Sequence, residues 1–319
     1  MHYEATVPTV QDRVVQAALR RVLEPSYEWD FAAHSYGFRP HRGCKDALRR
    51  VDHLLAAGYT WIVDADLKSC FDTIPHAPLL ERVREKVADG QVLRLLEQYL
   101  KQQVRETGRS WTPEGGTPQD AVVSPLLANI YLDPLDHQMA QDGIEMVRYA
   151  DDFVVLCRSR AEAEQALARA REWTATAGLT VQPDKTRIVD ATQDSFDFLG
   201  YRCDRGRKWP RQTSRQHFRD TIRAKTRRTN GQSLKVIIAE VNRTLRGWFE
   251  YFKHSDKTTF PSEDGWVRGR LRSLLRKRQH RKGRARGDDH HRWPNCFFTG
   301  QGLFSLAAAH ARACQSSRR

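Results

Sequence analysis

Two adjacent aspartates, Asp151 and Asp152, are the residues whose type and spacing most directly suggest chemistry. The β-branched, aromatic and aliphatic residues of the stretch 148–155 predict two short strands joined by a tight turn around them. Aspartate is a poor strand former, so we expect both carboxylates to project together from a hairpin tip. With a third carboxylate from elsewhere, such a pair is able to chelate two Mg²⁺ ions. Taken alone, the pair is more often a solvated turn.

A third carboxylate is available at the end of the segment 61–67, which reads as a strand. Alternation places Trp61 and every second residue after it on one face, and Asp64 and Asp66 on the more polar face. Three such carboxylates suit nucleotidyl transfer, because the transferred phosphate gathers negative charge that two Mg²⁺ ions neutralise. Mg²⁺ accepts few protein carboxylates and keeps substrate phosphates as ligands.

The elements around these residues mix helices with hairpins. We expect helices over 9–23, with Thr9 and Asp12 as a cap pair and an end at 24–25, and over 44–57, 77–87 and 90–103. A loop over 115–123 leads to a helix that Ser124 caps. An alanine-rich helix follows at 159–178, then a second hairpin over 179–189 and a short strand over 196–201. This order predicts an α+β fold, an antiparallel sheet with helices on one face.

Composition bounds the class of protein. A chain of 319 residues is long enough for two domains. It has no apolar run near the roughly 20 residues that span a bilayer, and its first residues show no secretory signal. Its six cysteines are scattered without paired spacing, which predicts a reducing, cytoplasmic location.

Charge divides the chain into two parts. Residues 1–203 hold 24 Lys+Arg and 30 Asp+Glu, a net charge of −6, whereas residues 204–319 hold 29 and 9, a net charge of +20. The basic part reads as helical, with an apolar stripe over 234–252 and a dense run of charge over 276–286. We therefore place a domain boundary after residue 203 and expect the second domain to bind a polyanion.

Several motifs together resemble one family. Residues 149–152, Tyr-Ala-Asp-Asp, resemble the signature of reverse transcriptases. Other segments resemble group II intron reverse transcriptase–maturases: 63–72 their first catalytic aspartate segment, 116–132 their nucleotide-binding loop and helix, and 183–186 and 198–201 their later palm blocks. The segment 233–252 resembles their maturase-specific thumb, and 293–295 and 302–306 resemble their tail. Because these motifs follow the family's order over residues 7–319, the chain is identified as a member of that family.

The resemblance implies a right-hand-like polymerase. Residues 1–203 are expected to form partial fingers and a palm, and residues 204–319 a helical thumb, or maturase-specific domain, with a tail. Family members begin with more fingers sequence, so this chain is expected to have truncated fingers, and it leaves no room for an appended endonuclease domain. The cluster at 288–291 is not expected to bind metal, because it has no matching second ligand pair.

The resemblance also assigns site residues. Asp66, Asp151 and Asp152 are expected to be the catalytic metal ligands, joined by the Leu67 carbonyl, and to hold two Mg²⁺ ions. Phe71, Gln119, Arg13 and Lys185 are the expected substrate-binding residues. Phe71 is implied to lie under the incoming sugar and exclude a 2′-hydroxyl, although its position suits a core aromatic equally well. Without the resemblance, Gln119 is a loop glutamine and Arg13 a solvated helix residue.

The implied partners are intron RNA, an RNA template with a DNA primer, and dNTPs. The expected RNA-binding residues are basic residues of the second domain: Arg205, Arg207, Lys208, Arg243, Arg246, Arg268, Arg270, Arg272, Arg276, Lys277 and Arg278. These features predict an RNA-directed DNA polymerase that also assists splicing and mobility of its intron. The alternative is a non-catalytic RNA-binding maturase or an inactive truncated remnant.

One departure from the family gives a first prediction. Gln119 is followed by Asp120, where the family normally has glycine. Glycine permits backbone conformations and a close approach that a side chain hinders, and aspartate adds negative charge beside an arriving triphosphate. We expect Asp120→Gly to raise the rate of primer extension. An unchanged rate, in a variant that folds equally well, would remove Asp120 as a cause of low activity.

Overall fold

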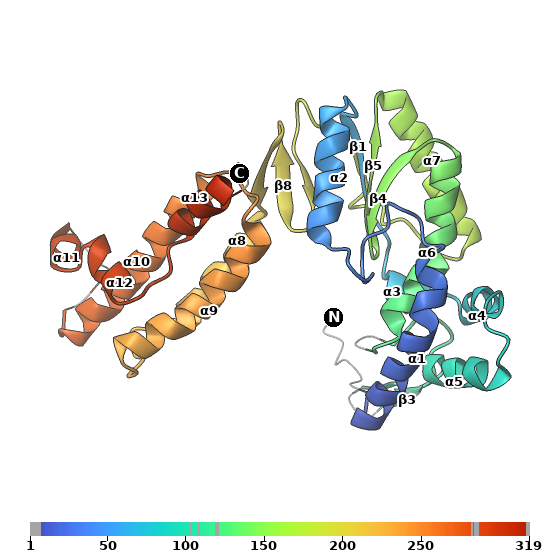
Figure 1. Cartoon of the computed structure of the whole chain (residues 1–319), viewed down its shortest axis with the longest axis horizontal. Coiled ribbons are helices and arrows are strands. Elements are labelled where there is room, and N and C mark those ends of the chain that lie inside the picture. The colour runs from blue at the N-terminus through green and yellow to red at the C-terminus, as the bar shows by residue number, and fades with distance from the viewer. Residues whose placement is uncertain are drawn as a thin grey trace. The chain divides into compact units, whose positions relative to one another are not determined.

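The computed structural model describes residues 8–102, 104–106, 109–118, 121–281, 283 and 287–316. The chain divides into two compact units, Met1–Leu199 (unit 1) and Gly200–Arg319 (unit 2), each with its own hydrophobic core (Figure 1). The division falls four residues before the boundary drawn from the charge distribution.

Unit 1 contains most of the strands. In chain order its elements are α1 (Val10–Glu28), α2 (Cys44–Ala56), β1 (Trp61–Asp66), α3 (Cys70–Thr73), α4 (His76–Arg84), α5 (Gly90–Leu100), β2 (Val104–Glu106), β3 (Arg109–Trp111), α6 (Ser124–Gln141), β4 (Glu145–Tyr149), β5 (Asp152–Cys157), α7 (Arg160–Thr176), β6 (Arg187–Asp190) and β7 (Phe196–Phe198). Strands β2 and β3 pair with each other. The larger sheet has the order β4-β5-β1-β6, and its neighbouring strands are all antiparallel.

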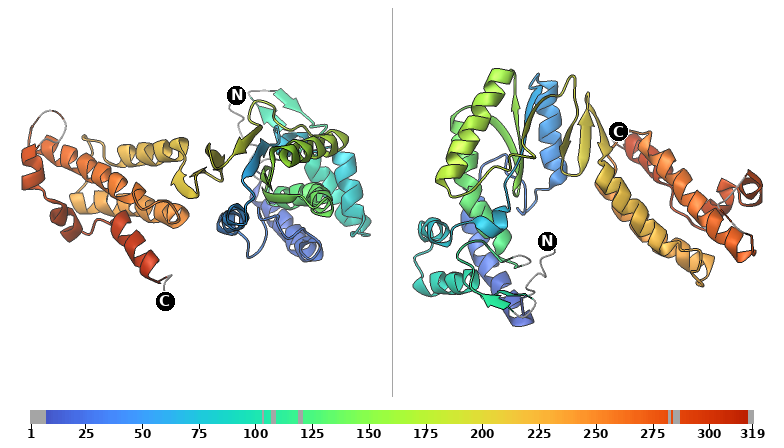
Figure 2. Two further views of the ribbon diagram at one scale, coloured as in Figure 1. Left: turned by 90° about the horizontal axis from the view of Figure 1, so that it is seen from above. Right: turned by 180° about the vertical axis from the view of Figure 1, so that it is seen from behind.

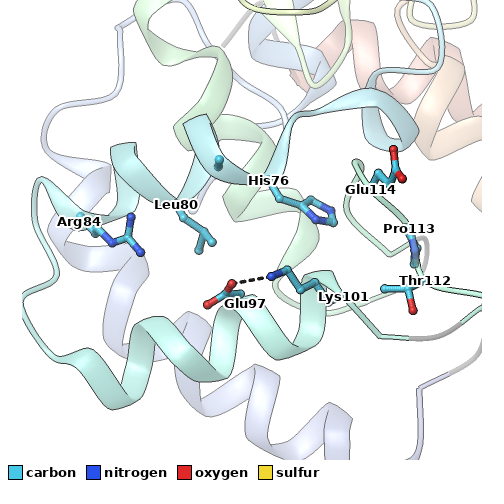
Figure 3. A pocket seen from close by; sticks show the side chains of 9 residues that line it. His76, Leu80, Arg84, Glu97, Lys101, Thr112, Pro113 and Glu114 are labelled. Atoms are coloured by element: carbon cyan, nitrogen blue, oxygen red, sulfur yellow. Dashed lines mark hydrogen bonds and ion pairs between the residues drawn. The ribbon is translucent and has the colours of Figure 1, made fainter.

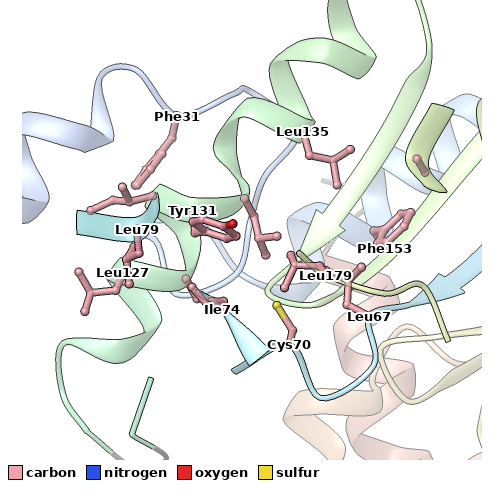
Figure 4. Close-up of a cluster of buried hydrophobic side chains, with 14 of the residues drawn as sticks. Phe31, Leu67, Cys70, Ile74, Leu79, Leu127, Tyr131, Leu135, Phe153 and Leu179 are labelled. Carbon is pink, nitrogen blue, oxygen red and sulfur yellow. The ribbon is translucent and has the colours of Figure 1, made fainter. Parts of the chain in front are cut away.

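The predicted alternation of β1 is confirmed. Val63, Ala65 and Leu67 belong to the main core cluster, together with Phe153 and Val155 of β5 (Figure 4). Buried residues of α6 and α7 also belong to this cluster, so these two helices cover one face of the sheet. The α+β class and the antiparallel sheet are therefore confirmed.

Helix α2 adds a second layer. It contacts β4 and β5 and buries Ala47, Leu48, Val51 and Leu54. Figure 1 and Figure 2 show α2 on one side of the sheet and α7 on the other. Strand β7 also contacts β1 and β5. The sheet is thus covered over part of both faces, and Asp64 and Asp66, which alternate with the Val63–Leu67 core residues, remain partly exposed.

Two expectations about helix ends are corrected. Helix α1 is capped by Thr9 and Asp12 as predicted, but it continues through Pro25 to Glu28. Its last turns pack into the core, where the Tyr27 hydroxyl donates to the Val83 carbonyl at 3.0 Å. Ser124 is the first residue of α6 and Val123 is its cap; the Ser124 hydroxyl donates to the Pro118 carbonyl at 2.8 Å.

The segment 179–189 does not pair with itself as a hairpin. Val181 forms a bridge with Leu67, the residue after β1, and β6 pairs with β1 itself. Both arms of the segment therefore pair with β1 or the residue that follows it. The turn between them holds Lys185 and is closed by the Thr186 amide, which donates to the Gln182 carbonyl at 3.1 Å. This arrangement brings the turn to the end of β1 that carries Asp66, because the Gln182 amide donates to the Asp66 carbonyl at 2.8 Å.

Unit 2 is mainly helical but begins with a hairpin that the sequence did not predict. Its elements are β8 (Tyr201–Asp204), β9 (Arg207–Pro210), α8 (Gln212–Lys225), α9 (Leu234–Phe252), α10 (Thr259–Arg278), α11 (Gly287–Arg292), α12 (Asn295–Gly300) and α13 (Leu306–Ser316). The predicted apolar stripe of α9 lies in the core of this unit, where Trp248 stacks on Phe218 with 4.6 Å between ring centroids. Across the described residues of both units, no helix has the length and apolar character that crossing a bilayer needs.

Candidate active site

The Asp-Asp pair lies at a hairpin tip, as predicted. Strand β4 ends at Tyr149, which pairs with Asp152 at the start of β5, so Ala150 and Asp151 form a two-residue loop. Ala150 has φ +60°, a backbone conformation that two-residue hairpin loops favour but that a non-glycine residue adopts at a cost of about 1–3 kcal/mol. The turn therefore depends on its surroundings to keep this conformation.

Asp66 lies directly opposite Asp152. The antiparallel register of β1 and β5 pairs these two residues. Residues paired in this way point to the same face, with Cβ atoms about 4.5–5.5 Å apart. Asp64 shares that face, because it lies two positions before Asp66 on β1. The fold thus brings Asp66 and Asp152, which are 86 positions apart in the chain, into contact distance, as a shared metal site requires.

The local electrostatics favour a cation. Burial, followed by the negative charges of Asp64, Asp66 and Asp151, raises the pKa of Asp152 to about 7. Burial and the charge of Asp66 likewise raise the pKa of Asp151. Clustered carboxylates repel one another, and a divalent cation relieves that repulsion while using the hard oxygen ligands it prefers. The donor set therefore fits Mg²⁺.

Two basic side chains meet the carboxylates on this face. The Lys185 ammonium bonds the Asp66 carboxylate at 2.5 Å, and the Arg187 guanidinium bonds the Asp64 carboxylate at 3.0 Å. Within the described residues, no three His, Cys, Asp or Glu side chains converge tightly enough to hold a metal ion as they stand. Lys185 is the cation that the Asp66 carboxylate holds in this structure, and its pKa is raised by Asp66 first and then by Asp151 and Asp152.

Aromatic residues lie beside the tip. The Phe71 ring packs partly against the main core and meets the Phe38 ring edge-on at 6.3 Å. Phe38 also contacts the Tyr149 ring, is 43% exposed, and has φ +59°. A large aromatic residue held exposed in a strained backbone conformation is typical of functional sites. Phe38 is therefore a candidate site residue that the sequence analysis did not name.

The structure describes some of the remaining expected site residues and not others. Gln119 and Asp120 lie outside the described residues. Leu67 directly follows Asp66, and its side chain is in the core. Arg13 is exposed on α1, one turn before Gln16, whose side chain accepts the Val122 amide at 2.8 Å. That bond holds α1 beside the segment that leads into α6.

The expected RNA-binding residues of unit 2 fall into three groups by exposure. Arg272 is buried, and its guanidinium donates to the Trp293 carbonyl at 2.9 Å and to the Asn295 side chain at 2.8 Å. Arg272 is thus a structural residue, and its assignment to the RNA surface is corrected. Four residues are half-buried: Lys208, Arg268, Arg270 and Arg276. Six are exposed: Arg205, Arg207, Arg243, Arg246, Lys277 and Arg278.

A cavity of about 560 Å³ lies elsewhere in unit 1 (Figure 3). It is formed by α4, α5 and the segment after β3, and its lining includes His76, Arg84, Lys101 and Glu114. Lys101 is paired with Glu97 at 2.7 Å, and the His76 ring bonds the Gly116 carbonyl at 2.7 Å. None of the expected catalytic residues lines this cavity, so it is separate from the aspartate site.

Comparison with known protein families shows which family the chain belongs to. Residues 3–203 match the family described as reverse transcriptase (RNA-dependent DNA polymerase), and residues 215–293 match the group II intron maturase-specific domain. The chain belongs to the group II intron reverse transcriptase–maturase family. Reverse transcriptases of this kind generally use divalent metal ions.

The chain is also similar to individual proteins. The chain is 32% identical to protein YkfC of Escherichia coli, over 63% of each chain. It is 39% identical to the group II intron-encoded protein LtrA of Lactococcus lactis, over 42% of this chain and 22% of LtrA. The apo telomerase structure from Candida tropicalis has a TM-score of 0.50 and 13% identity, over 83% of this chain and 48% of that chain, and so shares the fold. The chain spans less than two thirds of the length of YkfC and of LtrA.

Proposed function

We propose that the chain is an RNA-directed DNA polymerase with Asp66, Asp151 and Asp152 as its catalytic carboxylates. The observation that carries this proposal is the pairing of Asp66 with Asp152 across β1 and β5, next to the tip that holds Asp151. Two separate strands thus supply carboxylates to one face, where they form the anionic surface that Mg²⁺ and a triphosphate need.

The residues divide the work of nucleotidyl transfer. When bound, two Mg²⁺ ions lower the pKa of a primer 3′-hydroxyl and neutralise the charge of the triphosphate. Asp66, Asp151 and Asp152, with the Leu67 carbonyl, would hold them. Lys185, whose side chain is 65% exposed and paired with Asp66, would contact the arriving triphosphate.

The incoming nucleotide would be bound by residues around the tip. Phe71 and Phe38 provide an aromatic surface for its sugar and base. Gln119 and Arg13 complete the proposed nucleotide contacts, on the strength of the family resemblance.

The exposed basic residues of unit 2 would bind intron RNA and the template–primer duplex. Basic side chains contact phosphates without reading sequence, which suits a protein that grips an A-form duplex by its backbone. Assistance to splicing and mobility of the intron follows from the maturase-specific domain as part of this proposal. A cytoplasmic location is proposed from the scattered cysteines.

The direct test uses a DNA primer annealed to an RNA template, with Mg²⁺ and four dNTPs. We expect the wild-type chain to extend the primer and an Asp151→Ala, Asp152→Ala variant to lose extension. No extension by a folded wild-type chain would contradict the proposal.

One observation favours the rival function, a non-catalytic RNA-binding maturase. The Asp66 carboxylate already forms an ion pair with Lys185, a cation at the position where the proposal puts a divalent metal. The same assay separates the functions: RNA binding and splicing assistance that survive the double alanine change, with a wild-type chain that does not extend, would support the rival.

The charge of unit 2 predicts a steep salt dependence. If the six exposed residues each neutralise one phosphate, affinity for structured RNA should fall roughly 10³-fold between 50 and 200 mM salt. The measurement is a filter-binding titration across that range. Replacing Lys277 and Arg278 with glutamine should reduce the slope of log K against log salt by about two.

The control for this titration lies in unit 1. Arg49 and Arg160 are also exposed, with side-chain exposures of 69% each, but they are not expected to bind RNA. Replacing both with glutamine should leave the slope unchanged. A flat titration of the wild-type chain, or an equal effect of both double changes, would contradict the assignment of RNA binding to unit 2.

A further inference from the structure

Arg148 is a charged residue buried in unit 1, three positions before Asp151. Its side chain is 0% exposed, and its Nε donates to the two carboxylate oxygens of Asp136 on α6 at 2.8 and 3.0 Å. Burial acts to lower the pKa of Arg148, but the charge and hydrogen bonds of Asp136 outweigh it and raise that pKa. The guanidinium is therefore a permanent cation, and the catalytic roles proposed above do not use it.

The other N–H groups of Arg148 reach the turn and its neighbours. Nη1 donates to the Ala150 carbonyl at 2.9 Å and to the Asn129 side-chain oxygen at 3.1 Å. Nη2 donates to the Ser35 hydroxyl at 2.8 Å. Ala150 is the residue with φ +60° that leads into Asp151, so the guanidinium holds the carbonyl of the strained turn directly.

The loop before α2 holds the same turn from another side. A Cβ at Gly37 would lie 2.3 Å from the Ala150 backbone nitrogen, so only glycine allows this approach. The amide group of Asn129 donates to the Gly37 carbonyl at 2.8 Å. Asn129 therefore links both supports of the turn, the Gly37 backbone and the Arg148 guanidinium.

The loop also pairs with β4 itself. The Tyr36 amide donates to the Arg148 carbonyl at 2.9 Å, and the Arg148 amide donates to the His34 carbonyl at 3.0 Å. Phe38, which follows Gly37, contacts the Tyr149 ring. The aromatic surface and the aspartate tip are thus connected through one buried hydrogen-bond network.

We propose that Arg148 and Asn129 are positioning residues that fix the turn at Ala150 and thereby hold Asp151 and Asp152 in the arrangement that divalent cations bind. This inference rests on the proposed function, because it takes these aspartates as metal ligands. Partners that orient metal ligands typically change metal affinity or activity by 10–100-fold when they are removed. Asp136 alone would suffice to neutralise a buried arginine, whereas the observed network continues to the turn and to Gly37.

The test replaces Asn129 with leucine, which is similar in size and makes no hydrogen bonds. Mn²⁺ affinity is measured from the free-ion EPR signal in a complex of full chain, primer–template and dNTP, with a 3′-deoxy primer that prevents turnover. We expect the Mn²⁺ dissociation constant to rise roughly tenfold. In turnover assays kcat should fall by a similar factor, while KM for the primer–template stays unchanged.

Tyr131→Phe is the matched control. Tyr131 lies on the same helix, and its hydroxyl donates to the Ala177 carbonyl at 2.5 Å, so the change removes one hydrogen bond unconnected to the turn. Mn²⁺ affinity and kcat should stay at the wild-type values. Equal Mn²⁺ affinities in Asn129→Leu and Tyr131→Phe, at equal melting temperatures, would overturn the proposal.

A second variant covers the case in which Asn129→Leu does not fold. Arg148→Met combined with Asp136→Leu replaces the buried ion pair with apolar side chains, an exchange that proteins often tolerate. The folded double variant should show the same loss of Mn²⁺ affinity, and wild-type affinity in it would overturn the proposal. Failure of the wild-type chain to extend a primer would count against the proposed function, and the Mn²⁺ measurement would then decide the positioning role by itself.

Discussion

Asp151→Asn is expected to lower primer extension at least about 10³-fold, because two-metal catalysis supplies several kcal/mol of transition-state stabilisation and each 1.4 kcal/mol is a factor of ten. Asparagine keeps the size of the side chain but removes the charge that binds a divalent cation. Asp152→Asn and Asp66→Asn should have losses of the same order, since the three residues act as a unit. Single-turnover extension of a DNA primer on an RNA template measures each loss.

The matched control is Asp194→Asn. Asp194 is an exposed aspartate just past β6, whose Asp190 pairs with Trp61 at the end of β1 away from Asp66. Its replacement should leave the extension rate within about twofold, as for surface changes away from special features. If Asp151→Asn retains more than a tenth of the wild-type rate, Asp151 is not a metal ligand in the reaction.

Removing the charge of Asp152 should raise the stability of the chain, although it lowers the rate of primer extension. In EDTA, Asp152→Asn is expected to raise the melting temperature, because Asp152 is crowded by the charges of Asp64, Asp66 and Asp151. Active sites often carry such a conflict between stability and activity.

Asp136→Leu is expected to destabilise unit 1 by about 3–5 kcal/mol. The change leaves the Arg148 guanidinium buried without its counter-charge, since the Arg148 and Asp136 side chains are 0% and 4% exposed. Adding Arg148→Met should restore most of the lost stability, because the double change leaves no unpaired buried charge. Urea denaturation of the two single variants and the double variant measures the effect.

An exposed pair provides the comparison. Arg160 and Glu164 on α7 form an ion pair at 2.9 Å with side-chain exposures of 69% and 56%. Glu164→Leu should change stability by less than about 1 kcal/mol, as is usual for surface pairs. A cost of Asp136→Leu no larger than that of Glu164→Leu would show that Arg148 is not held as a buried charge.

The sequence predicted the parts of the site that depend on local patterns. Alternation in β1 placed Asp66 on the correct face, and the residues around Asp151 predicted the hairpin. Both signals come from the two-residue period of a strand and from the turn preference of aspartate. Thr9 was likewise recognised as a cap, because its capping bonds are made within four residues.

The missed features depend on contacts between distant segments. Gly37 was not singled out in the sequence, because its role comes from Ala150, more than a hundred positions later. Arg148 was treated only as a residue next to the Asp-Asp motif. A charged residue in an apolar strand indicates that it has a buried partner. Asp136 could not be named as that partner from sequence, because only the packing of α6 against the sheet brings the two together.

Two other errors have tertiary causes. The segment 179–189 was predicted as a hairpin from its turn residues. In the structure its two arms pair with β1 and with Leu67, not with each other. Arg272 was assigned to the RNA surface with its neighbours on α10, and it is buried because the tail segment packs over that side of the helix. Charge density in a sequence does not distinguish the two faces of a helix when both carry arginine.

The most direct test of this account is the sequence of the DNA made by the wild-type chain from a DNA primer on a defined RNA template with Mg²⁺. The account predicts cDNA complementary to the template, and none from the Asp151→Asn, Asp152→Asn variant. A folded wild-type chain that adds no nucleotides, or a variant that makes the same cDNA, would contradict it.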